Sequence, residues 1–210
     1  HVGDWDIKCT AYRKGGHGSL SLTESIMKSC NVAMMRIGAM MGSGIFAKYQ
    51  AMFGMGQKTG IDLPGEPDTS GLLYTADTMK PVDLATSSFG QTYNCTMVQM
   101  AAAFSSVING GSYYEPHVVR QIVNEQGAVV KKIEPKLVRE TVSESTSSFI
   151  RDALYRTVAE GTVRRQQFQD IKSAARQEQQ RSFPVPHVII CCPSVVLRPQ
   201  MIPRFWCMWW

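Results

Sequence analysis

The sequence predicts an α+β fold in which helices dominate and one antiparallel strand pair comes late in the chain. Apolar residues repeat at helical spacing in several segments before residue 109, and again after Ser143. Two apolar, β-prone runs, residues 118–123 and 128–133, flank the turn-forming residues 124–127 and have the pattern of a hairpin. A set of helices with a separate antiparallel pair is typical of the α+β class.

The first two helices have clear start and stop signals. The first 18 residues are polar and rich in glycine, and we expect a loop there. Ser21 and Glu24 have the spacing of a capping box, which predicts a helix start. Ser29 and Asn31 favour caps and turns over helix interiors. We therefore expect a helix break near Ser29 and a second helix from Asn31 to about residue 41.

The remaining helices also carry boundary signals. We expect them at residues 45–53, from Pro81 to the break at Gly90-Gln91, from Thr96 to the stop at Asn109-Gly110-Gly111, and after the cap residue Ser143. Residues 54–79 are rich in Gly, Pro, Asp and Thr, so we expect a long structured loop between the first and second of these regions.

Composition divides the chain after residue 162. The 210 residues are 44% hydrophobic and 19% charged, which fits one globular domain with a real core, and no apolar run is long enough to cross a bilayer. Residues 1–162 contain fifteen basic and fifteen acidic side chains, so the net charge of +5 resides in residues 163–210. That segment also has none of the 17 glycines and three of the four tryptophans. We expect a boundary there and no nucleic-acid partner.

The six cysteines show no spacing typical of a metal site, and Cys9, Cys30 and Cys95 are scattered along the chain. We therefore expect isolated thiols in small apolar slots, with no metal and no cofactor. His17 and His117 lack acidic or metal-ligating neighbours in the sequence, and we expect structural roles for both.

Five strings in a fixed order carry a family resemblance. They are HGSLSLTESIMKSCN (17–31), FGMGQKTGIDLPGE (53–66), PVDLATSSFGQ (81–91), MVQMAAAFSSVINGG (97–111) and YYEPHVVRQI (113–122). Together they resemble the transpeptidase domain of a monofunctional class B penicillin-binding protein of the division or sporulation type. The resemblance implies the penicillin-binding protein/serine β-lactamase fold. Residues 1–162 would be a partial transpeptidase domain, mostly the helical lobe plus a β-hairpin.

The resemblance also implies an activity and partners. In this family a serine attacks the terminal D-Ala-D-Ala bond of a peptidoglycan stem peptide, and an amine from a neighbouring strand resolves the acyl-enzyme into a cross-link. β-Lactams trap the same serine. The implied function is a peptidoglycan D,D-transpeptidase without a cofactor, anchored at the extracytoplasmic face of the bacterial membrane in a division or sporulation complex. Its implied partners are peptidoglycan stem peptides and β-lactam antibiotics.

Three motifs build the active site of this family: S-x-x-K, S-x-N and K-T-G. Ser29-Cys30-Asn31 matches S-x-N, and the resemblance implies catalytic roles for Ser29 and Asn31. The serine hydroxyl relays a proton toward the leaving group, and the asparagine holds the substrate amide. Gly90 and Gln91 lie in a loop that borders the site in the family, which implies a substrate-binding position.

Two further strings imitate the remaining motifs. Ser25 and Lys28 have S-x-x-K spacing but abut Ser29, so we interpret this match as coincidental and expect the true motif upstream of His1. Lys58-Thr59-Gly60 spells K-T-G, yet it lies in the predicted loop and not on a strand after the Ser143 helix. We expect a structural role for it.

Residues 163–210 break the resemblance abruptly. One permitted set of codons for residues 172–182, shifted to the third base of its first codon, translates as IGGKTGTAEK, which resembles the K-T-G strand of the family. The same shift lets residues 183–210 resemble the family. We interpret residues 163–210 as a poorly ordered, out-of-frame translation that follows a frameshift at or just after Thr162. The chain as written is therefore expected to be inactive.

Two alternatives stay open at this point. A β-lactam sensor has the same fold but binds without turnover, and slow deacylation without transpeptidation would distinguish it. Alternatively, the basic, Trp-rich segment 163–210 is a genuine attachment to nucleic acid or a membrane surface. Salt-sensitive binding that disappears when this segment is deleted would favour that alternative.

Overall fold

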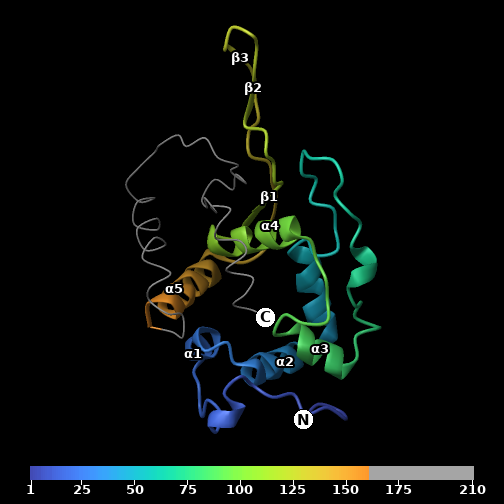
Figure 1. The fold of residues 1–210 in the computed structure, drawn as a ribbon, viewed down its shortest axis with the longest axis vertical. Coiled ribbons are helices and arrows are strands. Elements are labelled where there is room, and N and C mark those ends of the chain that lie inside the picture. The colour runs from blue at the N-terminus through green and yellow to red at the C-terminus, as the bar shows by residue number, and fades with distance from the viewer. Residues whose placement is uncertain (161–210) are drawn as a thin grey trace.

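A computed structural model describes residues 1–160 of the protein. Within them, five α-helices form the body and two separate two-stranded antiparallel sheets follow late in the chain (Figure 1). The predicted α+β class is confirmed. The helices are α1 (Leu22–Met27), α2 (Asn31–Met52), α3 (Pro81–Ser87), α4 (Met97–Ile108) and α5 (Glu144–Glu160), with 3-10 turns η1 (Tyr12–Lys14) and η2 (Ser70–Leu72). The strands are β1 (Ser112–Tyr114), β2 (Gln121–Val123), β3 (Val129–Lys132) and β4 (Leu137–Glu140).

The boundary of the two predicted domains lies outside the described residues, as does the whole of segment 163–210. None of the helices within residues 1–160 combines the length and the apolar character needed to cross a bilayer.

The predicted capping signals are confirmed. Ser21 Oγ accepts a hydrogen bond from the Glu24 backbone N–H at 3.2 Å, and the Glu24 carboxylate accepts one from the Ser21 N–H at 2.8 Å. This reciprocal pair satisfies two N–H groups that a helix start leaves without partners. Helix α3 begins with Pro81 at its first position, and α4 begins at a second capping box in which Thr96 pairs with Gln99.

The predicted helix break is also confirmed. Ser29 adopts a φ of 45°, which ends α1, and α2 starts two residues later at Asn31. Helix α2 is itself kinked at Gly42, where φ is 75° and ψ is 163°. Because these angles lie outside the helical region, the two halves of α2 correspond to the two helices expected at residues 31–41 and 45–53.

The long loop at residues 54–79 is structured because buried polar side chains hold it to α4. Gln99 is fully buried, and its amide donates hydrogen bonds to the Gln57 carbonyl at 2.6 Å and the Thr69 hydroxyl at 2.9 Å. A loop without regular hydrogen bonds needs such partners, since buried polar groups are costly when left unpaired.

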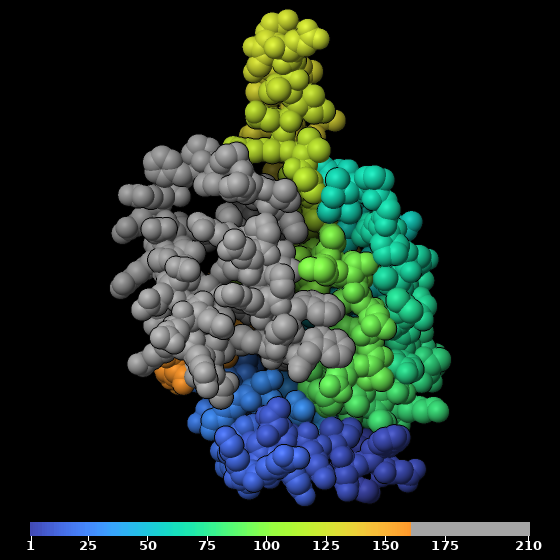
Figure 2. Space-filling model, in the orientation of Figure 1, coloured from blue at the N-terminus to red at the C-terminus, as the bar shows by residue number. Residues whose placement is uncertain are grey.

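The expectation of a single strand pair is wrong. Strands β2 and β3 form the predicted hairpin, which projects from the helical body and is exposed along its length (Figure 2). A second pair joins β1 to β4, with Ser112 opposite Glu140 and Tyr114 opposite Leu137. These strands have three and four residues and pair across the intervening hairpin. Runs this short carry too little alternation to be recognised from sequence.

Helix α5 packs on α1 and α4 (Figure 1). Small polar residues join the start of α5 and the segment before it to the end of α4. Ser147 Oγ accepts a hydrogen bond from the Gly110 N–H at 2.9 Å, and Thr141 Oγ1 donates to Ser106 Oγ at 2.9 Å. A Cβ at Gly111 would lie 1.9 Å from the Val142 carbonyl oxygen, so only glycine fits there. The Asn109-Gly110-Gly111 stop thus allows close backbone approach as well as ending α4.

Helices α2 and α3 form the apolar contact that positions the site. Met35 of α2 packs with Ala85 and Phe89 at the end of α3, and these residues are at most 8% exposed. Gly38 permits the approach, because a Cβ there would lie 2.7 Å from Ser88 Cβ.

Gly38→Ala is therefore expected to lower the free energy of unfolding by about 1–3 kcal/mol, since the added methyl group forces α2 and α3 apart. Gly44→Ala is the matched control on the same helix, because a Cβ added there would meet no atom within 4 Å. It should raise stability by about 0.5–1 kcal/mol through helix propensity. Urea denaturation of both variants checks this, and equal effects would contradict the packing argument.

Candidate active site

Ser29, Cys30 and Asn31 form the turn between α1 and α2, which we call the S-x-N turn. The Ser29 N–H donates to the Ile26 carbonyl and the Cys30 N–H to the Ser25 carbonyl, each at 3.0 Å. Cys30 is 6% exposed, whereas Ser29 and Asn31 on either side of it are half-buried. The main-chain hydrogen bonds and the buried Cys30 thus fix the turn, while the two predicted catalytic side chains are partly exposed to solvent.

Gly90 and Gln91 form a second turn directly after α3. The Gly90 N–H donates to the Ser87 carbonyl and the Gln91 N–H to the Thr86 carbonyl, each at 3.0 Å. The next residue, Thr92, has a φ of 70° and donates its hydroxyl to the Thr86 hydroxyl. Gln91 is exposed, so its amide is open to a ligand on this side.

Backbone strain coincides with these two turns. Ser29 and Thr92 are the residues other than glycine with positive φ within residues 1–160. Such conformations cost roughly 1–3 kcal/mol each and cluster at functional sites, where surrounding packing maintains them. The α2–α3 core supplies that packing, because Met35 follows the S-x-N turn and Phe89 precedes Gly90. Both candidate segments are thus built on one helix pair, although no hydrogen bond between them is found within residues 1–160.

The Ser25–Lys28 spacing does not form a nucleophile–base pair. Ser25 is 4% exposed and donates its hydroxyl to the Ser21 carbonyl at 2.8 Å, whereas Lys28 is exposed. Both residues belong to the end of α1 and its cap, so they do not face the S-x-N turn from a separate helix.

The K-T-G look-alike lies in the loop, as the sequence predicted. The Thr59 N–H and hydroxyl both donate to Glu66 Oε1 at 2.7 Å, and the Gly60 N–H donates to Glu66 Oε2 at 3.2 Å. Although partial burial acts to raise the pKa of Glu66, these hydrogen bonds outweigh it and lower that pKa. The string therefore closes a loop around a carboxylate.

Three side chains converge beside the S-x-N turn, and we call them the Cys9–His17–Cys30 cluster. Cys9 Sγ lies 3.8 Å from Cys30 Sγ and 3.4 Å from His17 Nδ1. The expectation of isolated thiols is wrong for these two cysteines. Sequence spacing missed the cluster because its members come from the first loop, the approach to α1 and the start of α2, which only the tertiary fold brings together.

Backbone groups act on Cys9 in this cluster. Burial acts to raise the pKa of the Cys9 thiol. Nearby polar groups outweigh this effect and lower that pKa: the backbone N–H groups of Ala11 and Asn31, and the side chains of Thr10 and Cys30. The Asn31 N–H belongs to the S-x-N turn, so Cys9 links the first loop to the candidate catalytic residues.

Comparison with known families matches residues 1–176 to the penicillin-binding protein transpeptidase domain. The chain belongs to this family. The match takes in all five strings that carry the resemblance, and it extends into segment 163–210.

Individual proteins similar to this chain are consistent with the family match. Stage V sporulation protein D of Bacillus subtilis is 40% identical over 159 residues, covering 75% of this chain and 24% of the relative. The D,D-transpeptidase domain from Eggerthella lenta shares the fold, with a TM-score of 0.67, 23% identity, and coverage of 77% of this chain and 42% of that one. Penicillin-binding protein 3 of Mycobacterium tuberculosis, solved with aztreonam, has a TM-score of 0.58 and 26% identity. This similarity covers 66% of this chain and 30% of the M. tuberculosis chain.

Glu66→Gln is expected to lower the free energy of unfolding by about 1 kcal/mol at neutral pH, since solvent screening limits the value of partly exposed charge-assisted hydrogen bonds. The pKa of Glu66 is lowered in the folded state, so its contribution is present above the ordinary glutamate pKa of about 4.3 and disappears as the pH falls through the folded value. Denaturation at successively lower pH in this range should show the free energies of unfolding of the wild type and the variant becoming equal. A deficit independent of pH would contradict the role of the carboxylate.

Proposed function

We propose that this chain is part of a peptidoglycan D,D-transpeptidase that acts by serine acyl transfer. The observation that carries the proposal is the S-x-N turn, held in a strained conformation by α2–α3 packing in a chain of the transpeptidase family. The chain spans about a quarter of the length of its Bacillus subtilis relative, so the activity is that of a larger protein.

Ser29 and Asn31 have the chemistry that this reaction needs from an S-x-N motif. The Ser29 hydroxyl both donates and accepts, so it relays a proton between the attacking serine and the leaving amine. The Asn31 amide also offers both a donor and an acceptor, which suits it to hold a peptide bond of the substrate. Their half-buried positions on either side of Cys30 give a substrate access to both groups.

Gly90 and Gln91 support substrate binding in this proposal. Their turn follows α3 and depends on the same apolar core as the S-x-N turn. We assign peptidoglycan stem peptides as the substrate and β-lactams as inhibitors, and aztreonam is bound by the Mycobacterium tuberculosis relative. The proposed location is the extracytoplasmic face of the bacterial membrane, in a division or sporulation complex.

Segment 163–210 is proposed to be an out-of-frame translation, which leaves residues 1–162 as a partial domain without activity. We expect the coding DNA after the Thr162 codon to encode IGGKTGTAEK in a shifted frame, followed by further family-like sequence. Nucleotide sequencing from the Glu160 codon checks this. Codons that do not permit the shifted translation would overturn the frameshift and leave segment 163–210 as genuine protein.

The transpeptidase proposal is tested by labelling with a fluorescent penicillin, using the gene product with its upstream sequence and the restored frame. Ser29→Ala is expected to slow acylation about 100-fold, a typical value for loss of a proton-transfer group. Asn31→Ala should slow it as well, whereas Lys58→Ala in the K-T-G look-alike should label at the wild-type rate. Circular dichroism controls for folding. Folded Ser29 and Asn31 variants that label normally would refute these roles, and slow deacylation without cross-linking would indicate a sensor module.

A further inference from the structure

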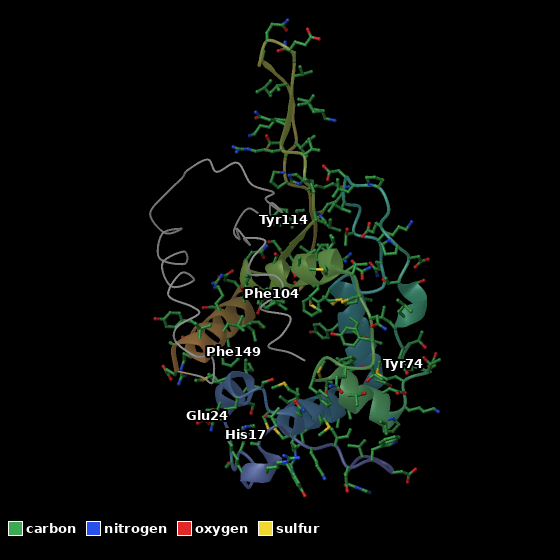
Figure 3. All side chains as sticks on the ribbon, in the orientation of Figure 1. His17, Glu24, Tyr74, Phe104, Tyr114 and Phe149 are labelled. Atoms are coloured by element: carbon green, nitrogen blue, oxygen red, sulfur yellow. The ribbon has the colours of Figure 1, made fainter. Side chains whose placement is uncertain are left out.

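The Cys9–His17–Cys30 cluster lies outside the groups used in the proposed reaction. One sulfur, one nitrogen and a second sulfur all lie within 4.8 Å of one another. His17 belongs to the segment leading into α1, at the end of the molecule that also carries the S-x-N turn (Figure 3). Cys30 is buried, and Cys9 and His17 are half-buried, so the cluster is shielded but still reachable from solvent.

The distances fit a tetrahedral metal site. With Zn–S bonds of about 2.3 Å and Zn–N bonds of about 2.0–2.1 Å, tetrahedral angles place two sulfurs about 3.8 Å apart and a sulfur and a nitrogen about 3.5 Å apart. The structure has 3.8 Å between the sulfurs of Cys9 and Cys30, and 3.4 Å between Cys9 Sγ and His17 Nδ1. Both distances agree with a shared zinc ion.

We propose that Cys9, His17 and Cys30 bind Zn²⁺, with a water molecule in the fourth coordination position. Thiolate and imidazole are the ligands that zinc prefers, and carboxylates or carbonyls would be needed for Mg²⁺ or Ca²⁺. Binding displaces the protons of the two thiols to solvent, and two thiolates with a neutral imidazole balance the charge of the ion.

The histidine distinguishes this site from a simple cysteine pair. A disulfide would require the two sulfurs to move from 3.8 Å to about 2.05 Å apart, and it would leave His17 Nδ1 without a role. A metal uses all three groups and needs almost no change in the two distances from Cys9 Sγ. We therefore favour zinc and treat a disulfide as the outcome that would contradict it.

The proposed ion would act as a structural clamp on the S-x-N turn. Cys30 lies between Ser29 and Asn31, and Cys9 and His17 lie in the segment that precedes α1. Coordination would fix that segment to the turn without occupying either proposed catalytic side chain. This inference goes beyond the transpeptidase proposal, and its readout is metal binding, which does not depend on acylation.

The first experiment titrates Co²⁺, a spectroscopic substitute for Zn²⁺, into the full chain after reduction and removal of metal. We expect thiolate-to-cobalt charge-transfer absorption and the visible bands of tetrahedral Co²⁺, both displaced by Zn²⁺. Cys9→Ser should abolish them, and His17→Gln should weaken Co²⁺ binding by at least about tenfold, since even supporting residues of metal sites have effects of that size. Cys95→Ser is the matched control, because Cys95 is a half-buried free thiol outside the cluster, and it should bind as wild type.

The second experiment uses the wild-type chain and so does not depend on whether a variant folds. Alkylation is followed by peptide mass spectrometry with and without Zn²⁺. Zinc should protect Cys9 and Cys30 at least about tenfold, because coordination occupies the thiolate electron pair that would attack the alkylating agent, and should leave Cys95 unprotected. Cys191, Cys192 and Cys207 are monitored separately, so any metal they bind is recognised.

Three results would overturn the proposal. They are a cobalt spectrum that persists in Cys9→Ser and His17→Gln, equal alkylation of Cys9 and Cys30 with and without Zn²⁺, and formation of a Cys9–Cys30 disulfide in air that Zn²⁺ does not prevent.

Discussion

The arrangement of the candidate site depends on the contact between α2 and α3. Gly38 lets the two helices approach closely, because a Cβ at this position would collide with Ser88. Met35, Ala85 and Phe89 fill the contact with apolar side chains. Each helix bears one of the two candidate turns at the end nearest this core. Because tightly packed interiors resist small displacements, the contact fixes the relative position of two turns that share no hydrogen bond within residues 1–160.

Local signals made much of the fold predictable. Ser21 with Glu24, Pro81 and Thr96 marked helix starts, because each signal acts on the N–H groups of the first helical turn, within a few residues along the chain. Ser29 marked the break for a similarly local reason. The β1–β4 pair and the Cys9–His17–Cys30 cluster were missed, since their partners come from separate segments of the chain and meet only through the tertiary structure.

The two look-alike motifs show that a matching sequence alone does not identify a catalytic group. Lys58-Thr59-Gly60 has the letters of a catalytic strand, but its N–H groups and hydroxyl are occupied by Glu66. Ser25 has the spacing of a nucleophile, but its hydroxyl is bound to the backbone of its own helix. The S-x-N turn differs, because no hydrogen bond of the Ser29 or Asn31 side chain is found within residues 1–160, and these two side chains flank a buried cysteine.

The contact between Cys9 and Cys30 also bears on how α2 begins. Helix starts are normally capped by a nearby Ser, Thr, Asp or Asn side chain, yet the N-cap residue of α2 is Cys30, whose side chain makes no capping hydrogen bond. Instead, Cys9 Sγ lies 3.8 Å from Cys30 Sγ at this helix start. The N-cap residue of the longest helix within residues 1–160 is therefore in contact with a residue from a distant loop. Changes in that loop's length would alter the start of α2 itself, whereas a local cap would have isolated the helix from them.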